Sequence, residues 1–386
     1  MERDQAIKFM LDLMKLMLQK NASDLFITVG FPPAMKIDGK VTPVSKQALT
    51  PDNAKALTYA VMNDRQLKEF EATKECNFAI SPQHMGRFRC NAYVQQGQPG
   101  LVLRTINTEI PSIDELNLPR VLKDVVMSKR GLVIVVGGTG SGKSTSLAAM
   151  IDHRNRNTNG HIITIEDPIE FVHPHRGCII MQREVGVDTE DWGVALKNSL
   201  RQAPDVILLG EIRDREGMEY GIQFSETGHL ALATLHANNA NQALDRVINF
   251  FPEERRQQLL LDLSVNLRAI ISQRLIKRRA GKGRIPAVEI LLNSPLITDL
   301  IEKGDVPEIK DVMKRSNEIG MQTFDQALFE LYEAEEITYE DALRNADSMN
   351  ELRLRIKLES QVSKGESTMK DLDHLSLEET EDRRIR

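Results

Sequence analysis

Apolar residues in the first hundred positions follow first a helical and then a strand pattern. Residues 1–20 carry apolar side chains three and four residues apart, which predicts an amphipathic helix whose methionine-rich side is core. Short apolar runs bounded by turn residues predict strands at 25–29, 34–37, 75–80, 86–95 and 100–106, with Asp38-Gly39 as a hairpin turn. A helix is expected from Pro51 to about Glu71. Residues 1–110 are thus predicted to form a small α+β domain with an antiparallel sheet.

After residue 130 the pattern changes to short, fully apolar runs that alternate with amphipathic helical stretches. Strands are predicted at 132–136, 161–165, 177–182, 206–209 and 230–235, with helices at 144–155, 192–200, 215–225 and 241–250. Runs that are apolar at every position are typical of parallel strands covered on both faces. The pattern therefore predicts an α/β fold with a parallel, doubly wound sheet, which binds ligands at the carboxyl ends of its strands.

The remaining segments complete the expected domain organisation. Pro111 and Pro119 bracket a linker, 111–120, before a nucleotide domain at 121–345. Residues 252–345 are expected to be mostly helical, with one hairpin near 279–284. Residues 346–386 are read as a C-terminal helix and an acidic tail, and the polar composition of 361–386 predicts disorder there.

Composition and charge exclude several classes of protein. No apolar run approaches the roughly 18 residues of a membrane span, and no signal peptide precedes the first helix, so a cytoplasmic protein is expected. Cys76, Cys90 and Cys178 are far apart, which argues against a disulfide framework and against a structural zinc site. A net charge of −6 disfavours a protein that binds nucleic acid over its whole surface.

The strongest chemical signal is the sequence GGTGSGKST at 137–145, which fits the P-loop pattern. It comprises Gly137, Gly138, Thr139, Gly140, Ser141, Gly142, Lys143, Ser144 and Thr145. A buried strand precedes it and a helix follows it, which is the context that a phosphate site requires. Lys143 is expected to reach the β- and γ-phosphates of ATP, and the Ser144 hydroxyl to be a ligand of Mg²⁺.

Two acidic sites follow predicted strands and are candidates for the chemistry of hydrolysis. Gly210 and Glu211 follow the run 206–209, and an acid at this place is typical of a Walker B carboxylate, which must lie near Mg²⁺. Glu170 lies in the cluster Glu166-Asp167-Pro168-Ile169-Glu170, where a carboxylate could orient the attacking water. Spacing alone leaves open whether Glu170 is catalytic or a loop acid.

Histidines and arginines supply weaker candidates. His229 and His236 flank the strand 230–235, and either could sense the γ-phosphate or be structural. Arg87 and Arg89 share one face of a strand and Arg104 is expected beside them, either meeting a nucleotide of a neighbouring subunit or forming surface salt bridges with acids such as Glu71 or Glu75. By spacing alone the salt-bridge interpretation is favoured.

Four motifs in this order resemble the secretion-superfamily ATPases: 137–145, TIEDPIEFVH at 164–173, DVILLGEIRD at 205–214 and TGHLALATLHAN at 227–238. The segments 22–40 and 86–93 resemble the pilus retraction branch of that family, PilT and PilU. The acidic tail and the helix-rich stretch after 321–325 look more like the PilU members. Gly138 departs from the branch, which often has proline at that position.

The resemblance implies a ring of six identical subunits, each with a PAS-like N-terminal domain and a RecA-like ATPase core. It implies Walker A roles for Lys143 and Ser144, a Walker B role for Glu211 and a catalytic role for Glu170. It places His229 and His236 in the family's histidine box, and Arg87, Arg89 and Arg104 on arginines that can approach nucleotide.

The function implied is a Mg²⁺-dependent ATPase motor that depolymerises a type IV pilus through an inner-membrane platform protein, alone or beside a paralogous retraction ATPase. No nucleic acid is expected as a partner. The alternatives are a pilus extension or type II secretion ATPase, a RecA-type nucleic-acid translocase, and a non-catalytic accessory ring.

Overall fold

The computed structural model describes residues 2–362 except 38, 107 and 108. These residues form two compact units. The first contains the chain up to Ser112 together with Val126–Gly131 and Ser144–Ala233, and the second contains Ile113–Val125, Leu132–Lys143 and the described residues from Thr234 onward. The tail expected at 361–386 falls outside the described residues beyond position 362, and so does Asp38 of the expected hairpin turn.

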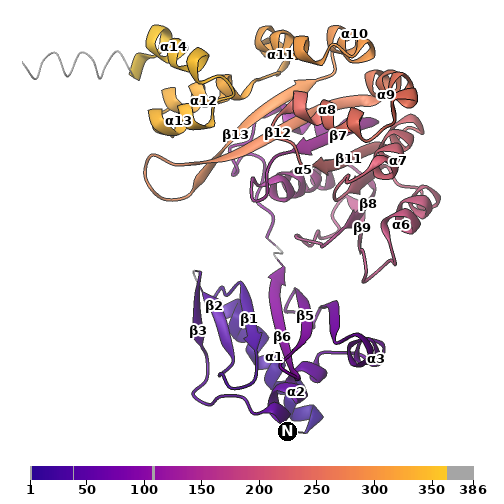
Figure 1. The fold of residues 1–386 in the computed structure, drawn as a ribbon, viewed down its shortest axis with the longest axis vertical. Helices are drawn as coiled ribbons and strands as arrows, with labels where there is room; N and C mark the ends of the chain where they lie inside the picture. The colour runs from indigo at the N-terminus through magenta and orange to yellow at the C-terminus, as the bar shows by residue number, and fades with distance from the viewer. Residues whose placement is uncertain (1, 38, 107–108, 363–386) are drawn as a thin grey trace, which may run out of the picture. The chain divides into compact units, whose positions relative to one another are not determined.

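The N-terminal part is an α+β fold, as the sequence predicts (Figure 1). Its antiparallel six-stranded sheet has the order β3-β2-β1-β6-β5-β4. The strands are β1 (Asp24–Ile27), β2 (Ala34–Ile37), β3 (Lys40–Pro43), β4 (Glu75–Ile80), β5 (Arg87–Gln95) and β6 (Gln98–Ile106). Helix α1 (Arg3–Gln19) buries Met10, Met14 and Met17 in the core of this part, so the methionine stripe is confirmed as core.

The helical stretch expected at 51–71 is present but interrupted, because the chain forms two helices there. They are α2 (Pro51–Ala60) and α3 (Asp64–Thr73). Asn63 interrupts the helical stretch as the N-cap of α3: its side chain accepts from Gln66 N, and the Gln66 side chain accepts from Asn63 N. This reciprocal capping satisfies two backbone N–H groups that a continuous helix would have bonded internally.

The second sheet has seven strands in the order β13-β12-β7-β11-β10-β8-β9. The strands are β7 (Gly131–Val136), β8 (Gly160–Glu166), β9 (Cys178–Glu184), β10 (Val206–Leu209), β11 (Leu230–Leu235), β12 (Leu267–Lys277) and β13 (Arg284–Leu292). Every residue of β7, β10 and β11 is buried, as expected of strands covered on both faces. The expected all-parallel sheet needs one correction, because β13 pairs with β12 in the antiparallel sense.

The helices that accompany these strands agree with the predicted alternation, apart from the helix at 121–126, which precedes β7 and was not predicted. They are α4 (Val121–Val126), α5 (Lys143–Asn157), α6 (Trp192–Ser199), α7 (Arg215–Glu226), α8 (Ala240–Asn249) and α9 (Glu253–Asn266). Side-chain oxygens of Asp191, Asp214 and Asn239 cap the N-termini of α6, α7 and α8. Such caps satisfy backbone donors at the point where each helix leaves a loop.

Residues 252–345 are expected to be mostly helical with one hairpin near 279–284, but the structure has a longer hairpin, which takes up 267–292. The run Leu267–Lys277 adds to the sheet parallel to β7. The expected hairpin near 279–284 is confirmed, with Lys277 opposite Arg284. Burial decided this, because a β-branched apolar run that lies beside another buried strand is stabilised as a strand by the pairing.

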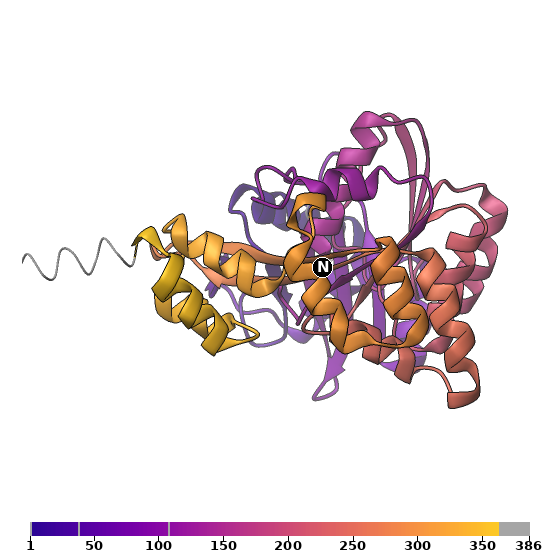
Figure 2. The same ribbon diagram turned by 90° about the horizontal axis from the view of Figure 1, so that it is seen from above.

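The helices that follow this hairpin are orange and yellow in Figures 1 and 2; those at 324–359 pack beside the hairpin, and those at 295–315 pack on α8 and α9. They are α10 (Pro295–Lys303), α11 (Val306–Arg315), α12 (Phe324–Glu333), α13 (Tyr339–Asn345) and α14 (Met349–Glu359). Ile276 and Ile285 of the hairpin share a core with Phe324, Leu328 and neighbouring residues of these helices. In the described part of the chain, no helix combines the length and the apolar character that crossing a bilayer requires.

Candidate functional site: a glycine loop and two acidic turns

The glycine loop connects β7 to α5, as the motif predicts. Gly137 has φ +155° and Gly142 has φ +90°, both in the region that favours glycine. A Cβ on Gly137 would lie 2.4 Å from Ser141 Oγ and 2.6 Å from the Gln273 carbonyl oxygen. The loop therefore has its glycines where a side chain cannot fit, which leaves its backbone open to an anion.

Gln273 on β12 supports the loop from behind. Its side chain is 3% exposed, and its Nε2 donates to the carbonyl oxygen of Ser141 over 2.9 Å. A Cβ on Gly142 would lie 2.7 Å from the same Nε2. Because β12 pairs with β7 up to the Ser272–Val136 position, Gln273 comes directly after the end of that pairing. The neighbouring strand thus fixes the shape of the loop.

Two polar groups of the loop have the character of a phosphate site. Lys143 Nζ donates to the carbonyl oxygens of Gly137 and Gly138, over 2.8 and 3.1 Å. Ser141 is 9% exposed, and its Oγ is buried without a hydrogen-bond partner among the described residues. A buried hydroxyl without a partner is unfavourable unless a ligand or water supplies one. Bound phosphate oxygens would supply it, so the loop fits a nucleotide.

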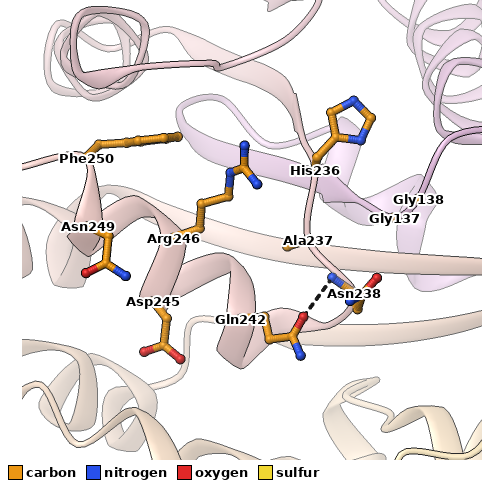
Figure 3. A pocket seen from close by; sticks show the side chains of 10 residues that line it. All are labelled: Gly137, Gly138, His236, Ala237, Asn238, Gln242, Asp245, Arg246, Asn249 and Phe250. Atoms are coloured by element: carbon orange, nitrogen blue, oxygen red, sulfur yellow. Dashed lines mark hydrogen bonds between the residues drawn. The ribbon is translucent and has the colours of Figure 1, made fainter.

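A cavity of about 590 Å³ opens beside the first two glycines of the loop (Figure 3). Its size is within the range of small-molecule sites. His236, which follows β11, lies on its wall. The remaining wall is formed by the loop after His236 and by one side of α8. The lining residues are Gly137, Gly138, His236, Ala237, Asn238, Gln242, Asp245, Arg246, Asn249 and Phe250.

Glu166, the last residue of β8 and the first acid of the turn that follows it, has a carboxyl group with an unusual proton affinity. Burial raises the pKa of Glu166 to about 7, although hydrogen bonds from Thr164 and Gln182 act in the opposite direction. Thr164 Oγ1 donates to Glu166 Oε1 over 2.7 Å, and Gln182 Nε2 donates to the same oxygen over 3.2 Å. The nearby charge of Glu170 also raises this pKa. A carboxyl group that titrates near neutral pH is typical of functional sites.

Glu170 itself is exposed, four residues further along this turn. The turn is attached to β9, because Ile169 N donates to Glu184 Oε2 over 3.3 Å. Glu170 is close enough to Glu166 for its charge to act on that carboxyl group, and the catalytic role of Glu170 stays a prediction.

The second acidic turn follows β10 and carries Glu211. Arg213 Nε donates to Glu211 Oε2 over 2.8 Å, and Arg213 Nη1 lies 3.4 Å from Asp167 Oδ2. Arg213 thus joins the turn after β10 to the turn after β8. The hydrogen bond to Glu211 is the main reason why the pKa of Arg213 is raised. The sequence did not single out this arginine.

The two predicted histidines lie at opposite ends of β11. β11 pairs in parallel with β10, with Leu230 opposite Val206, so His229 lies at the amino edge of these strands. Glu211 follows the carboxyl end of β10, roughly 15 Å away at the usual rise per residue. His229 Nδ1 is 3.1 Å from the Phe224 carbonyl oxygen and 3.0 Å from Thr227 Oγ1. The structure does not bring His229 and Glu211 together.

The three arginines of the N-terminal part differ in their partners. Arg104 lies opposite Arg89 in the sheet, as expected, and its Nε donates to Asp24 Oδ1 over 2.8 Å. Arg87 Nη2 is 3.5 Å from Glu184 Oε2. Salt bridges therefore form at two positions, with acids other than the anticipated Glu71 and Glu75. Within the part of the chain that the structure describes, Arg89 has no ion-pair or hydrogen-bond partner.

Comparison with known proteins identifies the family. Residues 2–372 match the family described as type II/IV secretion system protein. The chain belongs to this family. It is 58% identical to the type IV pilus ATPase PilU of Pseudomonas aeruginosa over 364 residues, 94% of this chain and 93% of that protein.

Two further relatives agree with this family membership. The chain is 41% identical to the type IV pilus retraction ATPase PilT of the same organism, covering 87% of this chain and 97% of that one. The crystal structure of the pilus retraction motor PilT with bound ADP superimposes with a TM-score of 0.83 at 39% identity, covering 89% of this chain and 98% of that chain. The expected family, fold class and enzyme class are therefore confirmed: this member of the secretion system family is an α/β ATPase.

Residues that shape the site and that sequence reasoning missed share one feature: each acts through another segment of the chain. Gln273 supports the glycine loop, Gln182 holds Glu166, and Arg213 joins two acidic turns. The polar stretch Ser272-Gln273-Arg274, between the apolar residues 269–271 and 275–276, was an available signal. It could have been recognised, because buried polar side chains need a partner.

Proposed function

We propose that this protein is a motor that hydrolyses ATP to drive type IV pilus retraction. The observation that carries the proposal is the supported glycine loop, with a buried hydroxyl, Ser141 Oγ, that lacks a partner among the described residues. The names of the similar proteins, a type IV pilus ATPase and a pilus retraction motor, supply the process.

Within this proposal the loop residues bind the phosphates of ATP. Backbone N–H groups of residues 137–142 surround the phosphate oxygens, and Lys143 exchanges its carbonyl partners for the β- and γ-phosphates. Ser144 and Glu211 would hold Mg²⁺, and the ion would neutralise charge that develops on the phosphate oxygens. The described residues contain no cluster of three or more acidic, histidine or cysteine ligands. A Mg²⁺ site of this kind does not need one, because nucleotide phosphates and waters complete it.

The acidic turn supplies the proton chemistry. Glu170 orients the attacking water, and Glu166, whose pKa is about 7, lies beside it as a group able to hold a proton at neutral pH. His236 faces the cavity next to the glycine loop and senses the terminal phosphate. For His229, the resemblance to the family's histidine box is the only support for a catalytic role.

Assembly into a ring gives the N-terminal arginines a role. We assign residues 1–110 to a PAS-like domain, 111–120 to a linker, 121–345 to a RecA-like core and 346–386 to a C-terminal extension. In a homohexamer, Arg89 is the arginine most available to a neighbouring subunit's nucleotide, while Arg87 and Arg104 would first release their acidic partners. Closure around ATP and opening after hydrolysis then move one domain against the other.

The proposed setting is the cytoplasmic face of the inner membrane. There the ring acts on a pilus platform protein and works alone or beside a paralogous retraction ATPase. An accessory ring without turnover is the outcome that would most change this proposal.

Phosphate release by the purified protein tests the enzyme claim. Glu211→Gln removes the carboxylate charge and should lower turnover by about 100-fold with ADP binding retained. Glu340→Gln, an exposed acid of α13, is the matched control and should turn over like the wild type. Wild-type phosphate release no faster than that of Glu211→Gln refutes the ATPase motor.

Deletion of the gene tests the process. Loss of a retraction motor leaves cells with excess surface pili and no twitching, whereas loss of an extension motor leaves cells without pili. A deletion strain without pili would reassign the protein to extension or secretion.

A further inference from the structure

The cavity beside the glycine loop has a polar wall that none of the roles above uses. Gln242, Asp245, Arg246 and Asn249 occupy positions three, four and seven residues apart on α8, so they share one face of the helix. The opposite face, with Ala243, Leu244 and Val247, is buried. A helix fixed by its core on one side therefore presents these side chains to the cavity.

Arg246 is the only cationic side chain among the lining residues, and no ion pair in the described residues neutralises it. Figure 3 shows the carboxylate of Asp245 directed away from the guanidinium of Arg246. In this view the guanidinium lies between the side chains of Phe250 and His236. The guanidinium is held 5.9 Å from the centre of the Phe250 ring. Such a cation–π contact orients an arginine without neutralising its charge.

We propose that Arg246 is a catalytic residue that binds the terminal phosphate of the ATP held by the same subunit's glycine loop. This inference rests on the proposed ATPase function. One continuous cavity is lined by Gly137 and Gly138 of the loop, by His236 and by Arg246, so an anion on the loop shares its space with this cation. Gln242 helps to shape the wall, because its Oε1 accepts from Asn238 N over 3.3 Å.

A guanidinium suits this position better than a second lysine. Its planar fork can donate two parallel hydrogen bonds to a phosphate, whereas Lys143 acts as a point charge. In the transition state for transfer to water, negative charge is spread over the three equatorial oxygens of the terminal phosphoryl group. A preorganised cation next to those oxygens stabilises the transition state more than the ADP product complex. Arg246 should therefore discriminate between a terminal phosphate and its absence.

The affinity ratio between ADP and ADP–beryllium fluoride measures this discrimination directly. The fluoride complex imitates the terminal phosphoryl group, so Arg246→Gln should weaken its binding by about 10- to 100-fold while ADP binding changes less than about 3-fold. Arg246→Lys keeps the charge and should restore part of the ratio. Arg344→Gln, an exposed arginine of α13, is the matched control and should leave both affinities unchanged.

The outcomes separate this inference from the proposed function. An unchanged ratio in Arg246→Gln overturns the inference, and so does equal loss of both ligands, which would indicate a structural or inter-subunit role. If wild-type protein hydrolyses ATP and Arg246→Gln hydrolyses it equally fast, only the inference fails. If wild-type protein releases no phosphate, the proposed function fails, and the affinity ratio still decides whether Arg246 contacts the terminal group.

Discussion

The turn after β7 and the turn after β8 both follow buried strands of one sheet, yet they are built on opposite principles. The first removes side chains: Gly137 and Gly142 lie where a Cβ would collide with Ser141 or Gln273. The second depends on side chains: Thr164 and Gln182 hold the carboxyl group of Glu166. Backbone geometry therefore defines the phosphate-binding turn, and electrostatics defines the acidic turn.

This difference determines how each turn responds to change. A glycine loop should fail when atoms are added and should be indifferent to pH. The acidic turn should keep its structure when a carboxyl group is replaced by an amide of the same shape, and its stability should depend on protonation. The following predictions test that contrast, from the largest expected effect to the smallest.

Adding one methyl group at Gly137 should have the largest effect. Gly137→Ala places a Cβ against a backbone oxygen, which cannot move without shifting β12. An overpacking penalty of about 3 kcal/mol corresponds to about 100-fold weaker ATP binding, measurable by calorimetric titration. Gly138→Ala is the control, because nothing lies within 4 Å of its Cβ. Similar losses in both variants would contradict the steric account.

Glu166 should make stability depend on pH in an unusual direction. Its pKa is raised to about 7 from 4.5, so between these values the folded protein holds a proton that the unfolded chain has released. Stability should therefore fall as pH rises from about 4.5 to 7, and the loss should be complete above pH 7. Because the side chain is partly exposed, the total is about 1–3 kcal/mol.

Glu166→Gln imitates the protonated form and tests this effect. Urea unfolding at several pH values should show a flatter profile for the variant, which should be more stable than the wild type at pH 8. Glu340→Gln should leave the profile unchanged, since Glu340 is an exposed acid of α13. Parallel profiles for wild type and Glu166→Gln would show that this carboxyl group titrates normally.

Loss of the support behind the glycine loop should have an intermediate effect. Gln273→Leu removes the donor to the Ser141 carbonyl oxygen, a bond of about 1 kcal/mol, so ATP should bind about 5- to 10-fold more weakly. Gln322→Leu removes a similar bond, from Nε2 to the Val288 carbonyl oxygen, elsewhere in the fold. Gln322→Leu should lower the stability of the fold and leave ATP affinity unchanged. An equal loss of ATP affinity in both variants would show that the Gln273 contact has no specific effect on the glycine loop.

The two histidines should give the smallest contrast. His236→Gln changes the cavity wall and should lower turnover by about 5-fold. His229→Gln changes the opposite end of β11 and should lower turnover by less than about 3-fold, with a small loss of thermal stability from its bonds to Phe224 and Thr227. Steady-state kinetics of the two variants tests this. A larger loss of turnover in His229→Gln than in His236→Gln would contradict the expectation, because His229 lies at the end of β11 away from the cavity.

Much of the fold was predictable because the relevant patterns are local. The strands 206–209 and 230–235 have the predicted bounds, since runs of buried apolar residues end where turn residues begin. The helix break at Asn63 and the strand at 267–277 were not predicted. A reciprocal cap competed with helix propensity at Asn63, and pairing with β7 competed with it at 267–277.

The sequence by itself determined the glycine loop, the positions of Glu170 and Glu211 in turns that follow buried strands, and the family to which they belong. These depend on residue identity and short spacing, which the chain carries regardless of how it folds. Only the tertiary structure decided that Gln273 supports the loop, that Glu166 titrates near neutral pH, that His229 lies away from Glu211 and that Arg246 lines the same cavity as the first two glycines. Burial and charge depend on which distant segments become neighbours, and local sequence does not contain that information.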